Sequence, residues 1–326
     1  MTRAFWLPAT LPSIALALAL LAGPVVPNAQ TQVVYLPGGE TPPAPKDTTL
    51  TIRVRSLAPG VFAARVNHVW TGWVETTDGI LLIDATWADS SAAALADTIA
   101  ARSPGKAIRY LVLTHDHTDH FGGARRFLDA GAVLIAHKQE MAEIDSVLGR
   151  KPGKDDIGIS KKPHRIGKGE NAADVMWLGR PAHSGGDVLV FVPGRKILFA
   201  GDLVWNNSVP WLLDRSMNLK GWNASLDSLY AMRAKIDSIV PGHGDIAPPV
   251  PAIRFTLSYL RDVQEKAAKV AAGRTPIRAV REWGDLGAYQ GLEFYEEVHF
   301  MNIRRLYNEA RGVKTPGRRW VGTYRE

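Results

Sequence analysis

The chain has 326 residues, of which 46% are hydrophobic and 22% are charged, and it contains no cysteine. This length and composition are typical of a globular protein with a large core, and they exclude a disordered chain and a small disulfide-stapled fold. The net charge of +7 is spread in pairs such as Lys161–Lys162 and Arg318–Arg319, without a basic stripe that alternates with aromatic residues. A nucleic-acid partner is therefore not expected.

The first residues predict an export signal. A positively charged start, Met1-Thr2-Arg3, leads into a short apolar run from Ile14 to Ala22, which is the arrangement of a secretory signal peptide. Prolines interrupt the run before it reaches the ~18 apolar residues that a stable membrane span needs. Without a cysteine after the run, no lipid anchor is expected. We assign residues 1–29 to a signal peptide and expect a periplasmic or secreted protein.

A linker and a set of short strands follow the signal. Residues 30–48 are rich in proline and glycine and lack apolar periodicity, so they predict an extended linker. A helix is expected to begin at Ser90 or Ser91 and to run through Ala101. The short alternating apolar stretches that predict strands before this helix are 50–54, 61–64, 69–74 and 80–83.

Strands and helices then alternate up to about residue 250. Pro193-Gly194 predicts a tight hairpin, and residues 223–236 predict a helix. This order predicts an α/β domain over 49–250, with helices outside the sheets. Beyond it, apolar residues from Ile253 to Ala267 recur at helical spacing, and a second helix is expected between Gly291 and Gly312. Residues 251–326 therefore form a predicted helical C-terminal extension packed on the domain.

A cluster of histidines follows the apolar run 110–113. Three of the nine histidines fall within six positions, in the pattern His115-Asp-His117-Thr-Asp119-His120. Because side chains two apart lie on one side of an extended backbone, His115 and His117 can bind one ion. Asp119 and His120, past the bend, can turn toward a second. Imidazole and carboxylate groups are ligands that zinc accepts, so the cluster predicts a metal site.

Three single residues beside predicted strands extend this site. His183 precedes the strand 188–192, Asp202 closes the apolar run 197–202, and His243 closes the run 239–244. The order, spacing and flanking glycines of these motifs resemble the metallo-β-lactamase superfamily over about residues 50 to 250. The resemblance implies a four-layer αββα sandwich.

The resemblance also assigns a role to each ligand. It implies that His115, His117 and His183 bind the first metal, that Asp119, His120 and His243 bind the second, and that Asp202 bridges the two. We expect two Zn²⁺ ions per chain, with iron or manganese left open. A hydroxide shared by the two ions is then the expected nucleophile, with Asp119 and Asp202 as the catalytic carboxylates that orient it or accept its proton. Asp84 is expected to hydrogen-bond a ligand histidine.

The aspartate at position 202 narrows the expected reaction. In zinc β-lactamases the corresponding position resembles a cysteine or a serine, whereas an acidic bridge is similar to that of the glyoxalase II, lactonase, phosphodiesterase and sulfatase branches. We therefore expect hydrolysis of an ester, thioester, lactone or lactam carbonyl in a small-molecule substrate. A β-lactamase and a non-catalytic metal-binding protein of the envelope remain as alternatives, and the oligomeric state is left open.

Tryptophans in two predicted loops are candidates for substrate contact. Trp70 and Trp73 lie in a stretch that resembles the family's substrate-covering hairpin, and Trp205 and Trp211 follow the bridging aspartate. Lys220 is a candidate anchor for a substrate carboxylate.

Overall fold

The computed structural model describes residues 32–34, 50–273, 275–313 and 323–325. The predicted signal peptide at 1–29 lies outside the described residues, as does most of the linker predicted at 30–48. Within that linker, β1 (Gln32–Val34) pairs antiparallel with β14 (Thr323–Arg325), a strand that the sequence did not predict. Among the described residues, no helix has both the length and the apolar character that crossing a bilayer would require.

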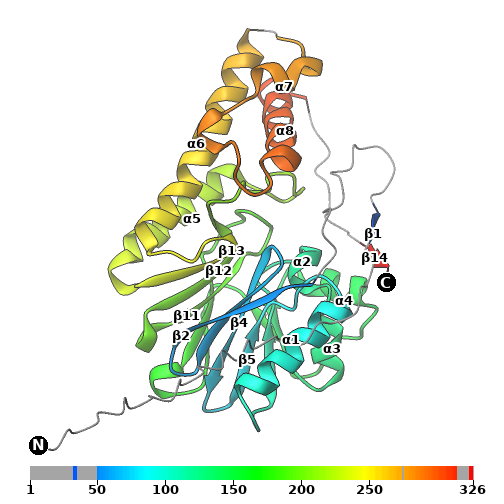
Figure 1. Cartoon of the computed structure of the whole chain (residues 1–326), viewed down its shortest axis with the longest axis vertical. Coiled ribbons are helices and arrows are strands. Elements are labelled where there is room, and N and C mark those ends of the chain that lie inside the picture. Colours follow the sequence, from blue (N-terminus) through cyan, green and yellow to red (C-terminus); the bar gives the residue numbers. More distant parts are fainter. Residues whose placement is uncertain (1–31, 35–49, 274, 314–322, 326) are drawn as a thin grey trace, which may run out of the picture.

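Two sheet halves form the centre of the molecule (Figure 1). They meet where β4 and β13 pair through Val69 and His243. The first half has the order β8-β7-β6-β5-β4-β3-β2, and the second has the order β13-β12-β11-β10-β9. The strands of the first half are β2 (Ile52–Ala58), β3 (Val61–Val66), β4 (Val69–Thr76), β5 (Gly79–Ile83), β6 (Ile108–Val112), β7 (Val133–His137) and β8 (Ile157–Ile159). Those of the second are β9 (His164–Ile166), β10 (Ala173–Trp177), β11 (Val188–Val192), β12 (Ile197–Asn206) and β13 (Ser238–Gly244).

Alternation along the strands explains how the halves pack. In β11, Val188, Val190 and Val192 join the core between the two halves, while Leu189 and Phe191 face the helices on the outside. The same period of two separates Leu81 from Leu82 in β5. Because successive side chains of a strand point to opposite faces, both faces of each half must be covered.

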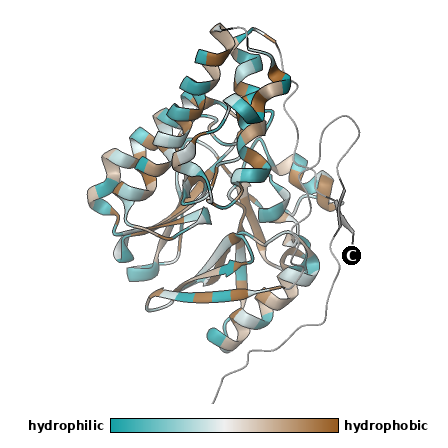
Figure 2. Ribbon diagram, turned by 45° about the horizontal axis from the view of Figure 1, so that its top comes forward, coloured by the Kyte–Doolittle hydropathy of each residue, from teal (hydrophilic) through white to brown (hydrophobic). Residues whose placement is uncertain are grey.

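Helices cover the two outer faces (Figure 1). The first half is covered by α1 (Asp89–Arg102), α3 (Ala124–Asp129) and α4 (Met141–Leu148), with the short α2 (Thr118–Phe121) beside them. The second half is covered by α5 (Leu219–Met232), α6 (Pro249–Ala272) and α8 (Phe300–Ala310), and the short α7 (Val280–Trp283) precedes α8. In Figure 2 these helices carry hydrophilic and hydrophobic residues side by side, as helices with one buried face do. The αββα sandwich predicted from the sequence is confirmed.

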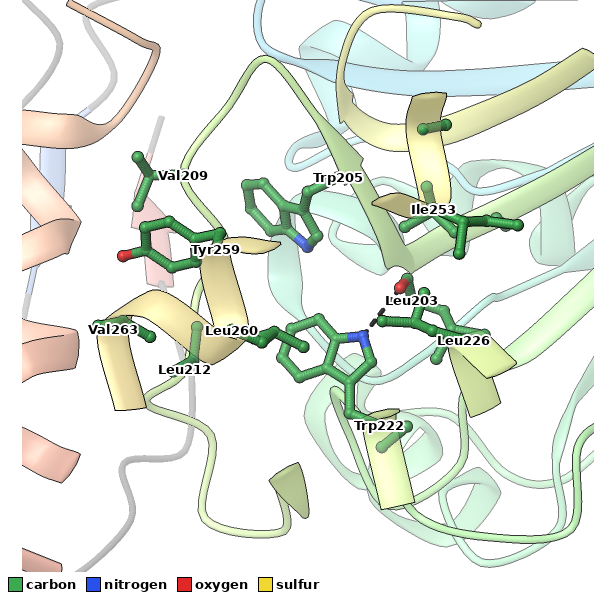
Figure 3. Close-up of a cluster of buried hydrophobic side chains, with 14 of the residues drawn as sticks. Leu203, Trp205, Val209, Leu212, Trp222, Leu226, Ile253, Tyr259, Leu260 and Val263 are labelled. Atoms are coloured by element: carbon green, nitrogen blue, oxygen red, sulfur yellow. Dashed lines mark hydrogen bonds between the residues drawn. The ribbon is translucent and has the colours of Figure 1, made fainter. Parts of the chain in front are cut away.

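Among the described residues, the hydrophobic core beneath α5 and α6 contains the most buried side chains. It joins the C-terminal extension to the sandwich (Figure 3). Trp222 of α5 is fully buried there, and its Nε1 donates a hydrogen bond of 2.8 Å to the Leu203 carbonyl of β12. Buried residues of α6 recur every three or four positions, at Ile253, Leu260 and Val263 among others. Burial of these large apolar side chains stabilises the extension against the sheet by about 1.5–3 kcal/mol each.

Several element boundaries differ from the sequence predictions. Ala88, rather than Ser90 or Ser91, is the N-cap of α1, and the Ser91 hydroxyl instead donates to the Ala88 carbonyl. α5 begins at Leu219 because the Asn218 side chain accepts a hydrogen bond from the Gly221 amide and caps the helix early. The helix expected from Gly291 begins only at Tyr295, with one π-helical turn (Tyr295–His299) before α8.

Candidate metal centre

The predicted ligands gather in two groups at the edge where the sheet halves meet. His115, His117, His183 and Asp202 form the first group, and within it the possible ligand atoms lie within 4.8 Å of one another. Asp119, His120 and His243 form the second group by the same measure. The histidines and Asp202 are buried, whereas the Asp119 side chain is 23% exposed. Solvent therefore reaches the cluster on the side of Asp119.

The carboxylate of Asp202 lies between the two groups. Its Oδ2 is 3.3 Å from His183 Nε2 and 3.8 Å from His115 Nε2. Its Oδ1 is 3.1 Å from His120 Nε2 and 3.6 Å from His243 Nε2. One oxygen therefore faces each group, which is the arrangement that a bridging carboxylate requires.

Two glycines let the Asp202 carboxylate occupy this place. The sequence predicted that Asp202 ends its strand, but β12 continues to Asn206, with an irregular register around Gly201. Gly201 has a φ of +49°, a backbone conformation that glycine adopts without strain. On the neighbouring strand, a Cβ at Gly242 would lie 1.8 Å from Asp202 Oδ1, so only glycine leaves room for the carboxylate there.

Asp84 orients two of the histidines. Its Oδ2 accepts a hydrogen bond of 2.8 Å from His120 Nδ1, which leaves Nε2 of that ring directed at the cluster. The same carboxylate accepts from the Thr114 hydroxyl, which lies 3.1 Å from His115 Nδ1. The expected hydrogen bond between Asp84 and a ligand histidine is confirmed. Partners of this kind fix the tautomer and the angle of a metal-binding ring.

The sequence did not identify the partners of two other rings. His117 Nε2 lies 3.1 Å from Asp214 Oδ2, so His117 Nδ1 faces the cluster, 3.1 Å from His183 Nε2. His243 Nδ1 donates to the main-chain oxygen of His68 at 2.9 Å. Asp214 stands in a loop that carries no motif, and the His68 contact is made by the backbone. Neither residue left a recognisable signal in the sequence.

Burial and the neighbouring carboxylates shift the pKa values of the cluster's side chains in different directions. Burial lowers the pKa of His183 to about 3 and lowers that of His115 well below its ordinary value, so both rings are neutral. Burial alone would lower the pKa of His117, but the hydrogen bond and charge of Asp214 raise it to about 9. Burial alone would raise the pKa of Asp202, but His243 and His120 hold it well below its ordinary value. Asp202 is therefore ionised, as a metal ligand must be.

The donor atoms fit a metal. His115 Nε2, His120 Nε2 and Asp202 Oδ1 are buried and have no hydrogen-bond partner among the described residues. Leaving such a polar atom unsatisfied costs about 1–3 kcal/mol. These atoms converge from different elements, and imidazole nitrogens with carboxylate oxygens are a donor set for zinc and similar divalent ions.

The tryptophans proposed for substrate contact lie mostly in the core. Trp73 is fully buried, stacks on Phe62 and donates to the Ser103 hydroxyl, so it does not face the cluster. Trp70 is 6% exposed in the core between the sheet halves. Both residues lie in β4, which matches the strand predicted at 69–74, and the burial of this strand on both faces places them in the core. Burial in this strand is the physical reason why Trp70 and Trp73 differ from the substrate contact that was predicted for them.

Trp205 supports a ligand instead of lining open space. Its ring stacks on His243 with centroids 4.3 Å apart, and its Nε1 donates to the Asp202 carbonyl. Trp205 is 3% exposed, and it contacts the predicted ligands His243 and Asp202 as well as the core under α6. Trp211 is half-buried against the core under α6. Lys220 is exposed in the first turn of α5, and its role as an anchor stays a prediction.

Comparison with known proteins gives one family. Residues 64–243 match the family model described as "Metallo-beta-lactamase superfamily". A metallo-beta-lactamase type 2 from Elizabethkingia meningoseptica is 26% identical over 231 residues, which cover 67% of this chain and 88% of that protein. One from Bacillus cereus is 24% identical over 177 residues, or 53% of this chain and 66% of that protein.

A solved structure agrees with this match. The metallo-beta-lactamase from Pontibacter korlensis superposes with a TM-score of 0.56 at 23% identity. The superposition covers 65% of this chain and 99% of the other. At this identity the likeness establishes the fold alone.

Proposed function

Since the chain belongs to the metallo-beta-lactamase superfamily, we propose that it is an exported hydrolase that uses two zinc ions to cleave an ester, thioester, lactone or lactam. The family and its relatives make the chain a metallo-hydrolase. The two-metal state, the choice of zinc, export and the substrate class are the proposed parts. The observation that carries the two-metal proposal is the Asp202 carboxylate, whose two oxygens face different ligand groups.

In the proposed mechanism, some residues bind metal and others also transfer protons. Bound divalent ions would polarise the scissile carbonyl and lower the pKa of water toward 7. Asp202 lies buried between the groups and fixes their separation. Asp119 is the most exposed of the ligand set and lies 3.1 Å from His243 Nε2 through its Oδ2. That position suits Asp119 to exchange a proton with a water molecule at the solvent side of the cluster.

A β-lactamase is the second candidate function. The relatives from Elizabethkingia meningoseptica and Bacillus cereus both carry that name. Against it stands the aspartate at 202, where the resemblance implies a cysteine or serine in zinc β-lactamases. A non-catalytic metal-binding protein is less well supported, because all seven ligand positions are filled and Asp84, Asp214 and the His68 carbonyl orient the rings.

Metal analysis joined to a hydrolysis panel tests the proposal. After reconstitution with zinc, iron or manganese, we expect close to two equivalents of metal per chain; less than about half an equivalent with every metal would contradict the site. The panel compares a cephalosporin, an acyl lactone, an aryl ester, a glutathione thioester and an aryl phosphodiester. A cephalosporin with kcat/KM at least about tenfold above every other substrate would favour the β-lactamase. Turnover of the phosphodiester alone would refute carbonyl chemistry.

Replacing the bridge tests the role of Asp202. Asp202→Ala should lower activity by at least about 100-fold and reduce the metal content, because the shared ligand is lost. His164→Ala on β9 is the matched control, since this histidine lies outside both ligand groups. Equal losses in the two variants would show that the ligand assignment is wrong.

A further inference from the structure

The C-terminal extension places the aromatic ring of Phe294 against His243, one of the predicted metal ligands. The Phe294 ring lies edge-on to the His243 ring, with centroids 5.5 Å apart and an interplanar angle of 82°. It also meets the rings of His68 at 5.5 Å and Trp205 at 6.3 Å. Phe294 packs against the core under α6 but is only half-buried, so the residue is partly open to solvent beside a predicted metal ligand.

The backbone at Phe294 is in an unfavourable conformation. Its φ of 65° and ψ of 8° lie in the left-handed region, which a bulky L-residue rarely adopts and which glycine or asparagine adopts readily. Residues held in such conformations cluster at functional sites, where the surrounding structure enforces them. A phenylalanine at this place therefore indicates a use for the ring itself.

Neighbouring contacts hold the Phe294 segment to the sandwich. The Glu293 carboxylate accepts two hydrogen bonds from Arg65 Nη2, at 2.8 and 2.9 Å, and lies 2.7 Å from His68 Nδ1. The Glu293 carbonyl accepts from the Val209 amide at 2.9 Å. His68 in turn binds His243 through its main-chain oxygen. The extension is thus tied to the same turn that orients a metal ligand.

The half-buried Phe294 and the partly exposed Asp119 carboxylate both lie against His243. Asp119 is the one member of the two ligand groups with substantial exposure, and its Oδ2 is 3.1 Å from His243 Nε2. A substrate that reaches the metals past Asp119 therefore arrives beside His243 and Phe294. The Arg65 guanidinium offsets the charge of Glu293, and the ring that Phe294 presents is apolar.

We propose that Phe294 contacts the substrate and that the C-terminal extension thereby sets a preference for an apolar acyl chain beside the scissile carbonyl. This inference rests on the proposed carbonyl hydrolysis at the metal cluster. An acyl chain against the ring would remove apolar surface from water, and each methylene buried in this way would strengthen binding by about fourfold. Small acyl groups such as acetyl would not reach the ring and would gain nothing from it.

The test compares 4-nitrophenyl octanoate with 4-nitrophenyl acetate on the zinc-loaded full chain. The ratio of kcat/KM for octanoate over acetate should be about tenfold or more in the native protein. Phe294→Asn keeps a residue suited to the left-handed backbone but removes the ring, so the ratio should fall close to one, mainly through a higher KM for octanoate. Phe294→Leu keeps an apolar side chain and should retain most of the preference.

A matched control, Phe300, shows whether the substrate preference depends on the position of the Phe294 ring or on the loss of any aromatic side chain from the extension. Phe300 belongs to the same extension and is also half-buried, but its ring faces Arg281, Tyr295 and His299. Phe300→Ala should therefore leave the substrate ratio unchanged. Metal content and melting temperature of each variant show whether the fold is intact. An octanoate-to-acetate ratio within about twofold of the native value in Phe294→Asn would overturn the proposal.

A binding measurement keeps this inference separate from the proposed reaction. The affinities of octanoate and acetate for zinc-loaded protein, measured by calorimetry, give the same ratio without turnover. If no ester is hydrolysed but Phe294→Asn removes the preference for octanoate, the reaction proposal fails and the Phe294 contact stands. If native protein and variant bind both acids with the same ratio, the Phe294 contact is refuted whatever the activity.

Discussion

Asp214 decides which nitrogen of His117 faces the metal cluster, although no motif marks it in the sequence. Its Oδ2 binds His117 Nε2, and the Ser216 amide and hydroxyl donate to its Oδ1. The carboxylate is thus fixed at one end by Ser216 and used at the other to orient a ring. An outer partner of this kind controls metal affinity because a ring that can rotate loses its alignment with the ion.

Removing the charge of Asp214 should weaken metal binding. We expect Asp214→Asn to lower the zinc affinity by about 10- to 100-fold, because His117 loses its charged partner. Competition with a chromophoric chelator measures this affinity. Asp227→Asn, on the exposed face of α5, is the control and should not change it. An Asp214→Asn variant with native affinity would show that His117 is oriented by other means.

Gly242 should prove as necessary as a ligand. In Gly242→Ala the new methyl would lie 1.8 Å from Asp202 Oδ1, so the carboxylate or β13 must move. We expect at least about a tenfold loss of activity with a loss of bound metal, because misplacement by about 1 Å is costly in a preorganised site. Gly185→Ala, whose Cβ has no neighbour nearer than 3.5 Å, should behave like the native protein. Metal analysis and initial rates of both variants decide the matter.

At the scale of elements, α8 holds the loop that carries Asp214. Arg305 of α8 is buried, and its Nη1 donates to the carbonyls of Leu212 and Asp214 at 2.6 Å each. Asn302 donates to the Pro210 carbonyl and accepts from the Leu212 amide. The extension is therefore part of the site's support as well as a cover on the sheet. The hydrogen bonds from α8 to this loop are buried.

His299 should make this extension sensitive to acid. Its Nε2 donates to the Gly284 carbonyl at 3.0 Å, so its Nδ1 accepts from the Tyr259 hydroxyl at 3.1 Å. Burial lowers the pKa of His299 from 6.5 to about 4, although Gly284 and Asp285 act to raise it. The unfolded chain then binds more protons between these pH values. The contribution of about 3 kcal/mol is fully present above pH 6.5 and is lost as the pH falls toward 4.

Urea unfolding at pH 7.5 and pH 4.5 measures this contribution. Between these pH values the native protein should lose about 2–3 kcal/mol more stability than His299→Gln, in which the titrating group is gone. Metal loss at low pH affects both proteins and cancels in the difference. His164→Gln on β9 serves as the control and should follow the native protein. Identical pH dependence of His299→Gln and the native protein would contradict a buried neutral histidine.

At the scale of the whole molecule, the cluster of predicted metal ligands lies where the two sheet halves join. His243 itself forms the pair between β13 and β4, and Asp202 comes from the adjacent β12. The remaining ligands come from the loops after β6 and β10 and from α2. The site therefore depends on the correct docking of both halves, and the extension secures that docking from the second half's outer face.

Export is the prediction that belongs to the whole chain. The charged start and the short apolar run lie outside the described residues, so it rests on the sequence alone. Mass spectrometry of the protein from its native host should give a mature N-terminus between about Ala22 and Val33. An intact Met1 in the cytoplasmic fraction would overturn the assignment and reopen the nucleic-acid alternative.

The sequence by itself determined what depends on local pattern. The alternation in β5 and β11, the helical spacing in α6 and the histidines after β6 are readable because strand and helix periods repeat over neighbouring residues. Asp84 was also recognised, since it follows a strand that leads to the site. The strand that contains Trp70 and Trp73 was predicted, but its burial on both faces, which places these two side chains in the core, could not be recognised from the local sequence.

Only the tertiary structure decided the contacts between distant segments. Asp214 meets His117 across 97 positions, and Glu293 meets Arg65 across 228. Such contacts depend on how the two sheet halves and the C-terminal extension dock. They cannot be predicted from the helix or strand periodicity of neighbouring residues. The same holds for Phe294, whose left-handed backbone and contact with His243 exist only after the extension folds back on the sandwich. Motifs in the sequence therefore mark the predicted ligands, while the packing of distant segments sets the orientation of their rings.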